Sequence, residues 1–128
     1  MATTMPAAPA SGGGPWPLEL RVKRAERRLE VDFDDGASFG LPAELLRVES
    51  PSAEVQGHVP SQKTTLGGKR NVAIARLEPV GNYAVRIVFD DGHSTGIYSW
   101  SYLHKLGREQ ERLWGDYLKA LEAKGLSR

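Results

Sequence analysis

Apolar and charged residues alternate along two stretches near the beginning of the chain. In residues 18–23 and again in 29–33 every second residue is apolar and the residues between are charged. A period of two is typical of strands that have one face on the core and the other in water. Residues 24–27 join the two stretches, so the pattern predicts a hairpin.

The same skeleton of residues occurs twice along the chain. Residues 33–40 and 89–96 both read Phe-Asp-Asp-Gly-x-Ser-x-Gly. In such a turn the Asp side chains bond to the backbone and Gly takes a positive φ, which closes a hairpin. The strand predicted over 83–89 is the most apolar one, which favours a central place in a sheet. The pattern therefore predicts two related halves, each a strand, a turn, a strand and a helix.

Helical spacing and capping residues complete this prediction. Pro42 suits the start of a short helix over 43–48, and Ser99 can cap a helix that runs from 100 to about Gly107. From Arg108 onward apolar residues recur at helical spacing. Residues 72–77 alternate as a strand that Pro79 ends or places at an edge. We predict the α+β class: a small antiparallel β-sheet from two related β-turn-β-helix halves, with a C-terminal helix packed on it.

Composition divides the chain into three parts. Residues 1–17 are mostly Ala, Thr, Pro, Gly and Ser, which offer too little apolar area to offset the entropy of ordering. We expect a disordered tail there, in which Trp16 is either docked on the domain edge or loosely held. Residues 18–107 form the predicted domain, and 108–128 form a helical extension that packs on it.

Charge and cysteine content exclude several classes of function. The 128 residues carry 17 Lys and Arg against 16 Asp and Glu, so no overall field attracts nucleic acid or an anionic membrane. The basic residues of the first hairpin alternate with acidic ones, which favours a solvated strand face over a nucleic-acid surface. Without cysteine the chain has no disulfide, thiol nucleophile or cysteine-ligated metal. No segment resembles a membrane helix or a signal peptide, so we expect a cytoplasmic protein.

No arrangement of residues predicts catalysis. The paired Asp residues of the two turns could act as coupled carboxylates, but their place in turns favours bonding to the backbone. No nucleophile motif or triad signature is present. His58, His93 and His104 lack the spacing of metal ligands. We therefore expect no catalytic residue, no metal and no cofactor.

The long polar connection from 50 to 70 is a candidate site for a small anion. Its candidate binding residues are His58, Lys63, Lys69 and Arg70. Gly67-Gly68-Lys69 is not a phosphate loop, because the first Gly of that motif, the preceding strand and the following Ser or Thr are missing. Loops of this length in compact domains are often functional or mobile.

The second copy of the repeated turn carries additional polar and aromatic groups. His93 follows Asp91-Gly92, and Tyr98 and Trp100 come shortly after it. An imidazole, a phenol and an indole around a concave spot suit a small ligand or a peptide. The first copy has Ala37 in place of His93, so the turn itself does not require His. The alternative interpretation is that His93 only bonds its own turn.

Several of these segments together resemble a known family. They are Gly-Asn-Tyr-Ala-Val at 81–85, Phe-Asp-Asp-Gly-His-Ser-Thr-Gly-Ile-Tyr-Ser-Trp at 89–100, Tyr-Leu at 102–103, Gly-Lys-Arg-Asn-Val at 68–72 and Glu-Pro-Val-Gly-Asn at 78–82. The combination resembles the small bacterial domain of unknown function now named the gamma-butyrobetaine hydroxylase-like N-terminal domain. The similarity covers about residues 18–107.

This resemblance implies an accessory role. Such domains occur alone, ahead of the catalytic domain of gamma-butyrobetaine and trimethyllysine dioxygenases, and attached to iron–sulfur carrier ATPases. In the oxygenases the domain helps to form the dimer and holds zinc through three cysteines and one histidine. By the resemblance His93 corresponds to that histidine, and the cysteines would fall near residues 50–54, where this chain has none. A zinc site is therefore not expected, and the chain has no room for the oxygenase domain.

Our first hypothesis is a non-catalytic interaction module for a protein partner, connected with iron–sulfur assembly or an oxygenase. It would use Asp91, His93, Tyr98, Trp100 and the loop 58–70, as a monomer or a weak homodimer. The alternative is a small-anion or metabolite binder that uses the basic loop. An enzyme is a weaker third hypothesis, and a nucleic-acid binder a fourth.

Overall fold

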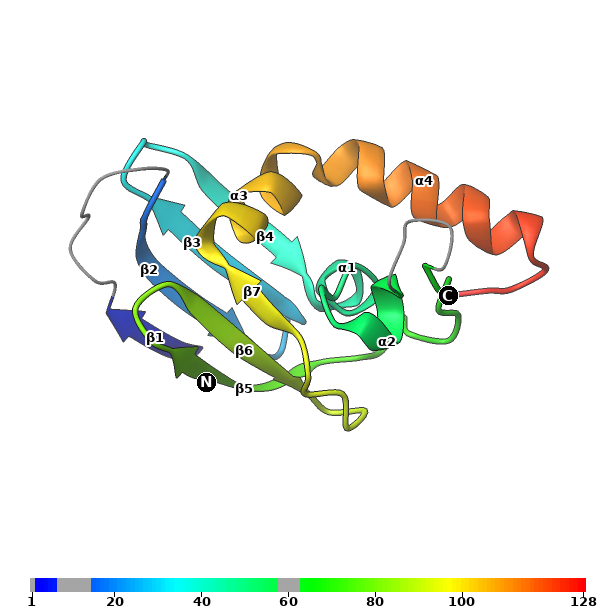
Figure 1. Cartoon of the computed structure of the whole chain (residues 1–128), viewed down its shortest axis with the longest axis horizontal. Coiled ribbons are helices and arrows are strands. Elements are labelled where there is room, and N and C mark those ends of the chain that lie inside the picture. The colour runs from blue at the N-terminus through cyan, green and yellow to red at the C-terminus, as the bar shows by residue number, and fades with distance from the viewer. Residues whose placement is uncertain (1, 7–14, 58–62) are drawn as a thin grey trace.

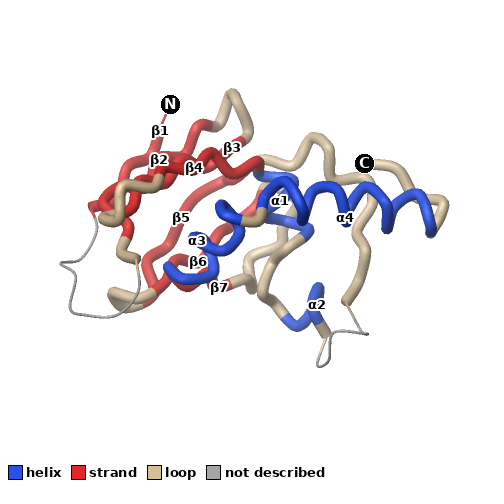
Figure 2. Tube along the Cα trace, turned by 90° about the horizontal axis from the view of Figure 1, so that it is seen from above, coloured by secondary structure: helices blue, strands red, loops and turns tan. Residues whose placement is uncertain are grey.

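Strands lie at one end of the molecule, and the C-terminal helix extends toward the other (Figure 1). The computed structural model describes residues 2–6, 15–57 and 63–128. Its strands are β1 (Ala2–Pro6), β2 (Pro17–Lys23), β3 (Arg28–Phe33), β4 (Ser38–Pro42), β5 (Ile74–Val80), β6 (Ala84–Phe89) and β7 (Ile97–Ser99). Its helices are α1 (Ala43–Val48), α2 (Ala53–Gln56), α3 (Trp100–Arg108) and α4 (Gln110–Ala123). Figure 1 shows α1 in the middle and α4 reaching away from the strands, and the view from above in Figure 2 shows the same division.

The strands form two antiparallel sheets. One sheet has the order β1-β2-β3-β4 and the other has the order β5-β6-β7. The predicted α+β class and the packed C-terminal helix are confirmed. The strands divide between two sheets instead of forming one, because each half of the repeat pairs its own strands through local hairpins. The most apolar strand, β6, is central in its sheet as predicted, and Pro79 lies in the edge strand β5.

The two halves share their turn chemistry bond for bond. In the first half Asp34 exchanges two hydrogen bonds with the backbone of Trp16, one through its N–H and one through its carboxylate. Asp35 accepts the N–H of Ala37 at 2.9 Å. The corresponding pairs of the second half are Asp90 with Ala73 and Asp91 with His93. The prediction that the Asp side chains bond the turn backbone is therefore confirmed for Asp35 and Asp91, whereas the side chains of Asp34 and Asp90 bond Trp16 and Ala73 outside the turns.

Each turn is also held by the helix of the other half. His104 of α3 lies with Nε2 2.9 Å from Oδ2 of Asp35 in the first turn. Arg47 of α1 donates from Nε to Oδ2 of Asp91 in the second turn, at 2.8 Å. The two halves are therefore interlocked by ion-pairing groups as well as by a shared core.

Helix α1 is the centre of the packing. All six of its residues are buried, and so are Glu49 and Ser50 directly after it. The main core contains apolar residues of both sheets together with residues of α1 and α3, among them Leu20, Leu29, Val31, Phe33, Leu41, Leu45, Leu46, Val85, Ile87, Phe89, Tyr98, Leu103 and Leu106. Burial of this apolar surface is the main favourable term in folding.

Helix α4 packs on the main core through Leu113 and Trp114, and on α1 through a second small core. Tyr117 and Leu121 form a second small core with Val48 of α1, against which Leu66 and Trp114 pack. The break between α3 and α4 lies at Glu109, two residues beyond the predicted end at Gly107, so Arg108 still belongs to α3. In the part of the chain that the structure describes, no helix is both long and apolar enough to span a membrane.

The prediction of a disordered tail is wrong for residues 2–6. They form β1, which pairs with β2 from Ala2 opposite Lys23 to Pro6 opposite Glu19. Strand pairing uses the backbone N–H and C=O groups of the open β2 edge, so it does not depend on an apolar sequence. Residues 1 and 7–14 of the expected tail lie outside the described residues. Helix α2, inside the connection 50–70, was also not predicted.

Candidate functional site

A polar cluster lies where the end of α1, helix α2 and the turn after β6 meet. Ser50 follows α1 directly and is fully buried. Ser52 caps α2, because its hydroxyl accepts the backbone N–H of Glu54 at 3.2 Å. His93 enters from the opposite side, from the turn that Gly92 closes with a φ of 93°. Local capping and turn rules therefore help to place three polar side chains at one point.

His93 bridges two elements through both ring nitrogens. Its Nε2 lies 2.9 Å from Oγ of Ser50, and its Nδ1 lies 3.1 Å from Oε2 of Glu54. Burial lowers the pKa of His93, and the positive charge of Arg47 lowers it further, while Glu54 and Asp91 act in the opposite direction. The ring is therefore held neutral near pH 7. Since its backbone N–H also serves the turn, both interpretations of His93 apply in part: it bonds its own turn, and it binds groups elsewhere in the chain.

Asp91 is the anion at the centre of the cluster. Its Oδ2 accepts from Nζ of Lys69 at 2.7 Å and from Nε of Arg47 at 2.8 Å. Burial by itself would raise the pKa of Asp91, but Lys69, the N–H of His93 and Arg47 more than offset it and lower that pKa to about 2. Among the described residues, Nη1 of Arg47 is buried without a hydrogen-bond partner.

The predicted aromatic partners of His93 do not form an open concave spot with it. Tyr98 is fully buried, and its hydroxyl donates to the carbonyl of Leu46. Trp100 is half-buried, and its Nε1 donates to the carbonyl of Asn82 at 2.9 Å. Both side chains therefore serve the fold, and Tyr98 ties β7 to α1.

The basic residues of the loop are not gathered into one anion site. Lys63 donates to both carboxylate oxygens of Glu49, at 2.8 and 2.7 Å, and Lys69 binds Asp91. Arg70 is exposed. His58 lies outside the described residues. Two of the four candidate cations are thus already paired with carboxylates at two different points.

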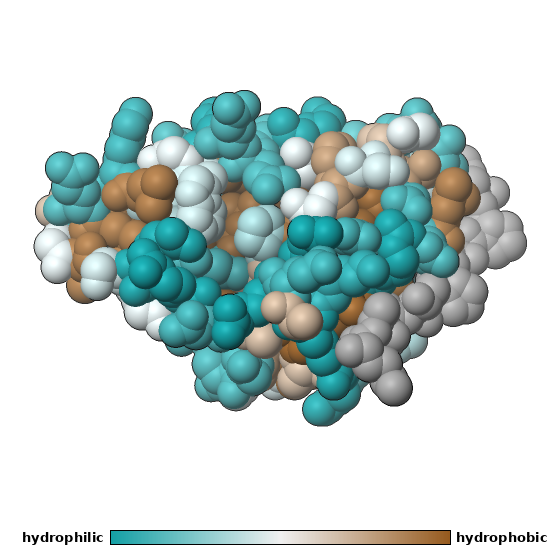
Figure 3. Space-filling model, turned by 180° about the vertical axis from the view of Figure 1, so that it is seen from behind, coloured by the Kyte–Doolittle hydropathy of each residue, from teal (hydrophilic) through white to brown (hydrophobic). Residues whose placement is uncertain are grey.

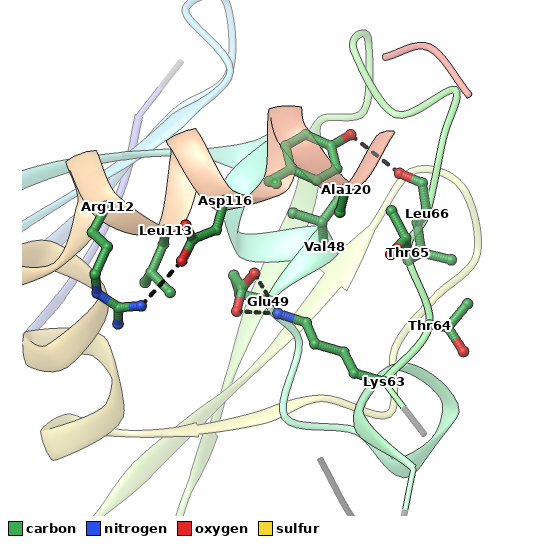
Figure 4. Close-up of a pocket in the computed structure, with 11 residues that line it drawn as sticks. Val48, Glu49, Lys63, Thr64, Thr65, Leu66, Arg112, Leu113, Asp116 and Ala120 are labelled. Atoms are coloured by element: carbon green, nitrogen blue, oxygen red, sulfur yellow. Dashed lines mark hydrogen bonds and ion pairs between the residues drawn. The ribbon is translucent and has the colours of Figure 1, made fainter. Parts of the chain in front are cut away.

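The structure contains a pocket that sequence reasoning missed. It has a volume of about 320 Å³ and lies between α4, the end of α1 and the segment that follows Lys63. Its lining is Val48, Glu49, Lys63, Thr64, Thr65, Leu66, Arg112, Leu113, Asp116, Tyr117 and Ala120. Figure 4 shows the Glu49–Lys63 pair on one side and the Arg112–Asp116 pair, 3.2 Å apart, on the other. The i, i+3, i+4, i+7 spacing of Leu113, Asp116, Tyr117 and Ala120 places them on one face of α4, but the spacing does not show that residues 63–66 lie opposite that face.

Tyr117 closes one end of this pocket. Its hydroxyl donates to the carbonyl of Leu66 at 3.1 Å and also lies 3.2 Å from Oε2 of the buried Glu44. Burial raises the pKa of Tyr117 to about 12, and Glu44 contributes in the same direction. The phenol therefore stays protonated and acts as a structural link between α4, α1 and the loop.

Comparison with known proteins gives one family and several similar structures. The family model described as gamma-butyrobetaine hydroxylase-like, N-terminal, matches residues 20–104. A protein solved in solution by NMR is 48% identical, with a TM-score of 0.79, over 95% of this chain and 91% of that one. A second NMR structure is 44% identical, with a TM-score of 0.71, over 84% of this chain and 86% of that one.

A crystal structure adds a relative with a known source. It is a protein of unknown function of the DUF971 family from Acidithiobacillus ferrooxidans. It is 42% identical to this chain, with a TM-score of 0.61, over 71% of this chain and 91% of that one. No curated protein matches the chain.

Proposed function

The chain belongs to the gamma-butyrobetaine hydroxylase-like, N-terminal family, and on that premise we propose that it is a non-catalytic accessory module that binds a protein partner. The family description supports this, because it names an N-terminal part of hydroxylase-like proteins. The resemblance to domains joined to oxygenases and to iron–sulfur carrier ATPases makes those two kinds of protein the first partners to test. We expect the module to act in the cytoplasm as a monomer or a weak homodimer.

The contacts of His93 and Asp91, the two candidate acid–base groups, support a structural role over a catalytic one. His93 is held by Ser50 and Glu54, and Asp91 is held by Arg47 and Lys69. A general acid or base needs a reacting proton within hydrogen-bond reach of a substrate. The side chains of His93 and Asp91 are instead bonded to other parts of the chain.

The pocket beside α4 is the observation that carries the proposal. Its floor is apolar, with Val48 and Leu113, and the charges around it are already joined in two ion pairs. A charged small ligand would compete with one of these pairs, whereas an apolar side chain against Val48 and Leu113 would not. A protein segment that inserts one apolar side chain and hydrogen-bonds to the rim therefore fits best.

The remaining surface offers less to a partner. On the face shown in Figure 3, apolar residues lie in separate patches divided by hydrophilic ones. The most exposed large apolar residues are likewise spread over different elements, with Leu18 on β2, Tyr83 before β6 and Leu118 on α4. Single exposed apolar residues are common on soluble domains and do not by themselves mark an interface.

Binding can be tested with an oxygenase or an iron–sulfur carrier protein encoded beside this chain. The isotope-labelled chain is titrated with each purified candidate, and amide shifts are followed by NMR. We expect shifts around 63–66 and 112–120. Asp116→Arg, which reverses one rim charge, should weaken binding by about tenfold, or about 1.4 kcal/mol.

Glu78→Arg is the matched control, because Glu78 is also a partly exposed carboxylate paired with arginine but lies on β5. It should leave the affinity unchanged. Shifts confined to regions away from the pocket, or equal losses in both variants, would contradict the proposal. Amide shifts at the pocket that appear with the wild type and are lost in Asp116→Arg would support the proposal.

The alternative of a small-anion or metabolite site is not favoured by a specific contact. Lys63 and Lys69 bind carboxylates of the chain itself, so an anion would compete with Glu49 or Asp91 for each of them. That competition lowers the affinity of any weak anion site in the loop.

A further inference from the structure

The donor and the acceptor of each hydrogen bond around His93 can be assigned. Glu54 is a carboxylate that can only accept, so Nδ1 of His93, at 3.1 Å, carries the proton. Nε2 is then an acceptor, and the hydroxyl of Ser50 donates to it across 2.9 Å. Oγ of Ser50 in turn accepts the backbone N–H of Ser52 at 3.3 Å. The chain of bonds runs from the start of α2 through the end of α1 into the β6–β7 turn and back to α2.

This is the place where the family resemblance implies zinc. The resemblance matched His93 with the zinc histidine and residues 50–54 with the cysteines, and the fold brings these two segments into contact. A structural zinc site takes four ligands, mostly Cys and His, at about 2.0 to 2.3 Å. This chain has no cysteine, and residues 50–54 contain serines instead. Both ring nitrogens of His93 already contact Ser50 and Glu54. The residues present do not fit a structural zinc.

Residues 50–54 and the turn that carries His93 are also in direct contact with each other. A Cβ at Gly96 would lie only 2.5 Å from Oγ of Ser50, so the backbone of the turn lies against that side chain. A second link joins the same segments, because the hydroxyls of Ser52 and Thr95 are 2.8 Å apart. The bridging that a metal would provide is thus supplied by protein groups alone.

We propose that His93, Ser50 and Glu54 form a metal-free clamp, in which hydrogen bonds replace a structural metal and fasten the β6–β7 turn to α1 and α2. In this chain the clamp makes folding independent of metal supply and of thiol oxidation. This inference does not depend on which partner the pocket binds.

The first test uses the unaltered protein. Nitrogen NMR of the histidine rings should show His93 protonated at Nδ1 and unprotonated at Nε2. The melting temperature should be the same with EDTA, with added Zn²⁺ and with neither, and native mass spectrometry should show the metal-free mass. A proton on Nε2, stoichiometric zinc in the purified protein, or a lower melting temperature in EDTA would overturn the clamp.

The second test measures coupling between the clamp residues. His93→Ala and Ser50→Ala should each lower the melting temperature, and the double variant should lose less than the sum of the two losses. His104→Ala is the control, because His104 bonds Asp35 at the other turn. Its loss should add to that of Ser50→Ala. Additive losses for His93 and Ser50 would overturn the proposal, and if a variant does not fold, the measurements on the unaltered protein decide.

Discussion

Gly107 and Gly115 both lie within helices, but their surroundings are opposite. A Cβ on Gly107 of α3 would lie 2.3 Å from the ring of Phe39, so this helix approaches β4 as closely as it does only because the side chain is absent. A Cβ on Gly115 of α4 would meet nothing within 4 Å. The first glycine is required by packing, whereas the second only lowers the helix propensity of its segment.

Alanine at these two positions should therefore have effects of opposite sign. Gly115→Ala should raise the free energy of unfolding by about 0.5 to 1 kcal/mol, since alanine loses less backbone entropy in a helix. Gly107→Ala should lower it by about 1 to 3 kcal/mol, since Phe39 must move. Urea denaturation of the two variants measures both values, and each serves as the control of the other. A stabilised Gly107→Ala variant would show that the contact with Phe39 is not tight.

The buried charges of α1 show how one element is held by several others. Glu44 and Arg47 of α1 are buried, and so is Glu49, which follows the helix. Their partners are Arg128 at the end of the chain, Asp91 in the second turn, and Lys63 in the loop. A buried charge is costly unless it is paired, so these contacts fix the position of each partner segment against α1.

Removal of the partner of Glu44 tests this arrangement. Glu44 receives three contacts from the guanidinium of Arg128, the shortest 2.8 Å, and among the described residues its other side-chain partner is the Tyr117 hydroxyl. Arg128→Ala should lower the free energy of unfolding by about 1 to 2 kcal/mol, because a carboxylate in a buried place loses its charge partner.

Arg76→Ala is the control for this prediction. Arg76 pairs with Glu78 on the outer face of β5, where its side chain is 62% exposed, so the change should stay within about 0.5 kcal/mol. Chemical denaturation compares the two variants, and equal effects would contradict a special role for the pair inside the molecule.

At the scale of the whole molecule, the two halves depend on each other. Each Asp-Asp-Gly turn is held by a helix of the other half, Asp35 by His104 and Asp91 by Arg47. The main core also takes residues from both sheets. Neither half completes its own turn contacts, so we expect the acid stability of the whole protein to depend on Asp91.

The sign of this dependence follows from the lowered pKa. Asp91 has a pKa of about 2 in the folded protein against an ordinary value of 3.8, so its ionised form stabilises the fold above pH 3.8 and that contribution is lost as the pH falls toward 2. Asp91→Asn should lower the melting temperature at pH 7 and weaken its dependence on pH between about 4 and 2. Calorimetry over this range measures both effects.

Asp116→Asn is the control for the acid prediction, since this carboxylate is 60% exposed and lies outside the turns. It should leave the curve of the wild type unchanged. An Asp91→Asn variant that loses stability in acid as steeply as the wild type would show that the contacts of Asp91 with Arg47 and Lys69 contribute little.

The sequence by itself determined most of the local structure of this protein, with β1 and α2 as the exceptions. The period of two in 18–23 and 29–33, the repeated Asp-Asp-Gly turns and the cap at Ser99, whose hydroxyl accepts the N–H of Tyr102 at 3.2 Å, all predicted elements that the structure contains. These signals are local, because strand pleat, turn geometry and helix capping depend on residues a few positions apart.

Only the tertiary structure decided how these elements are joined and which polar groups remain available. Ser50 and His93 are 43 residues apart in the chain, and no periodicity pairs them, although the family resemblance had matched their segments. The pocket also depends on long-range packing. Helix α4 and residues 63–66 lie opposite each other because both pack against the end of α1. Long-range packing selects one partner for each buried polar group, and that choice depends on the whole core.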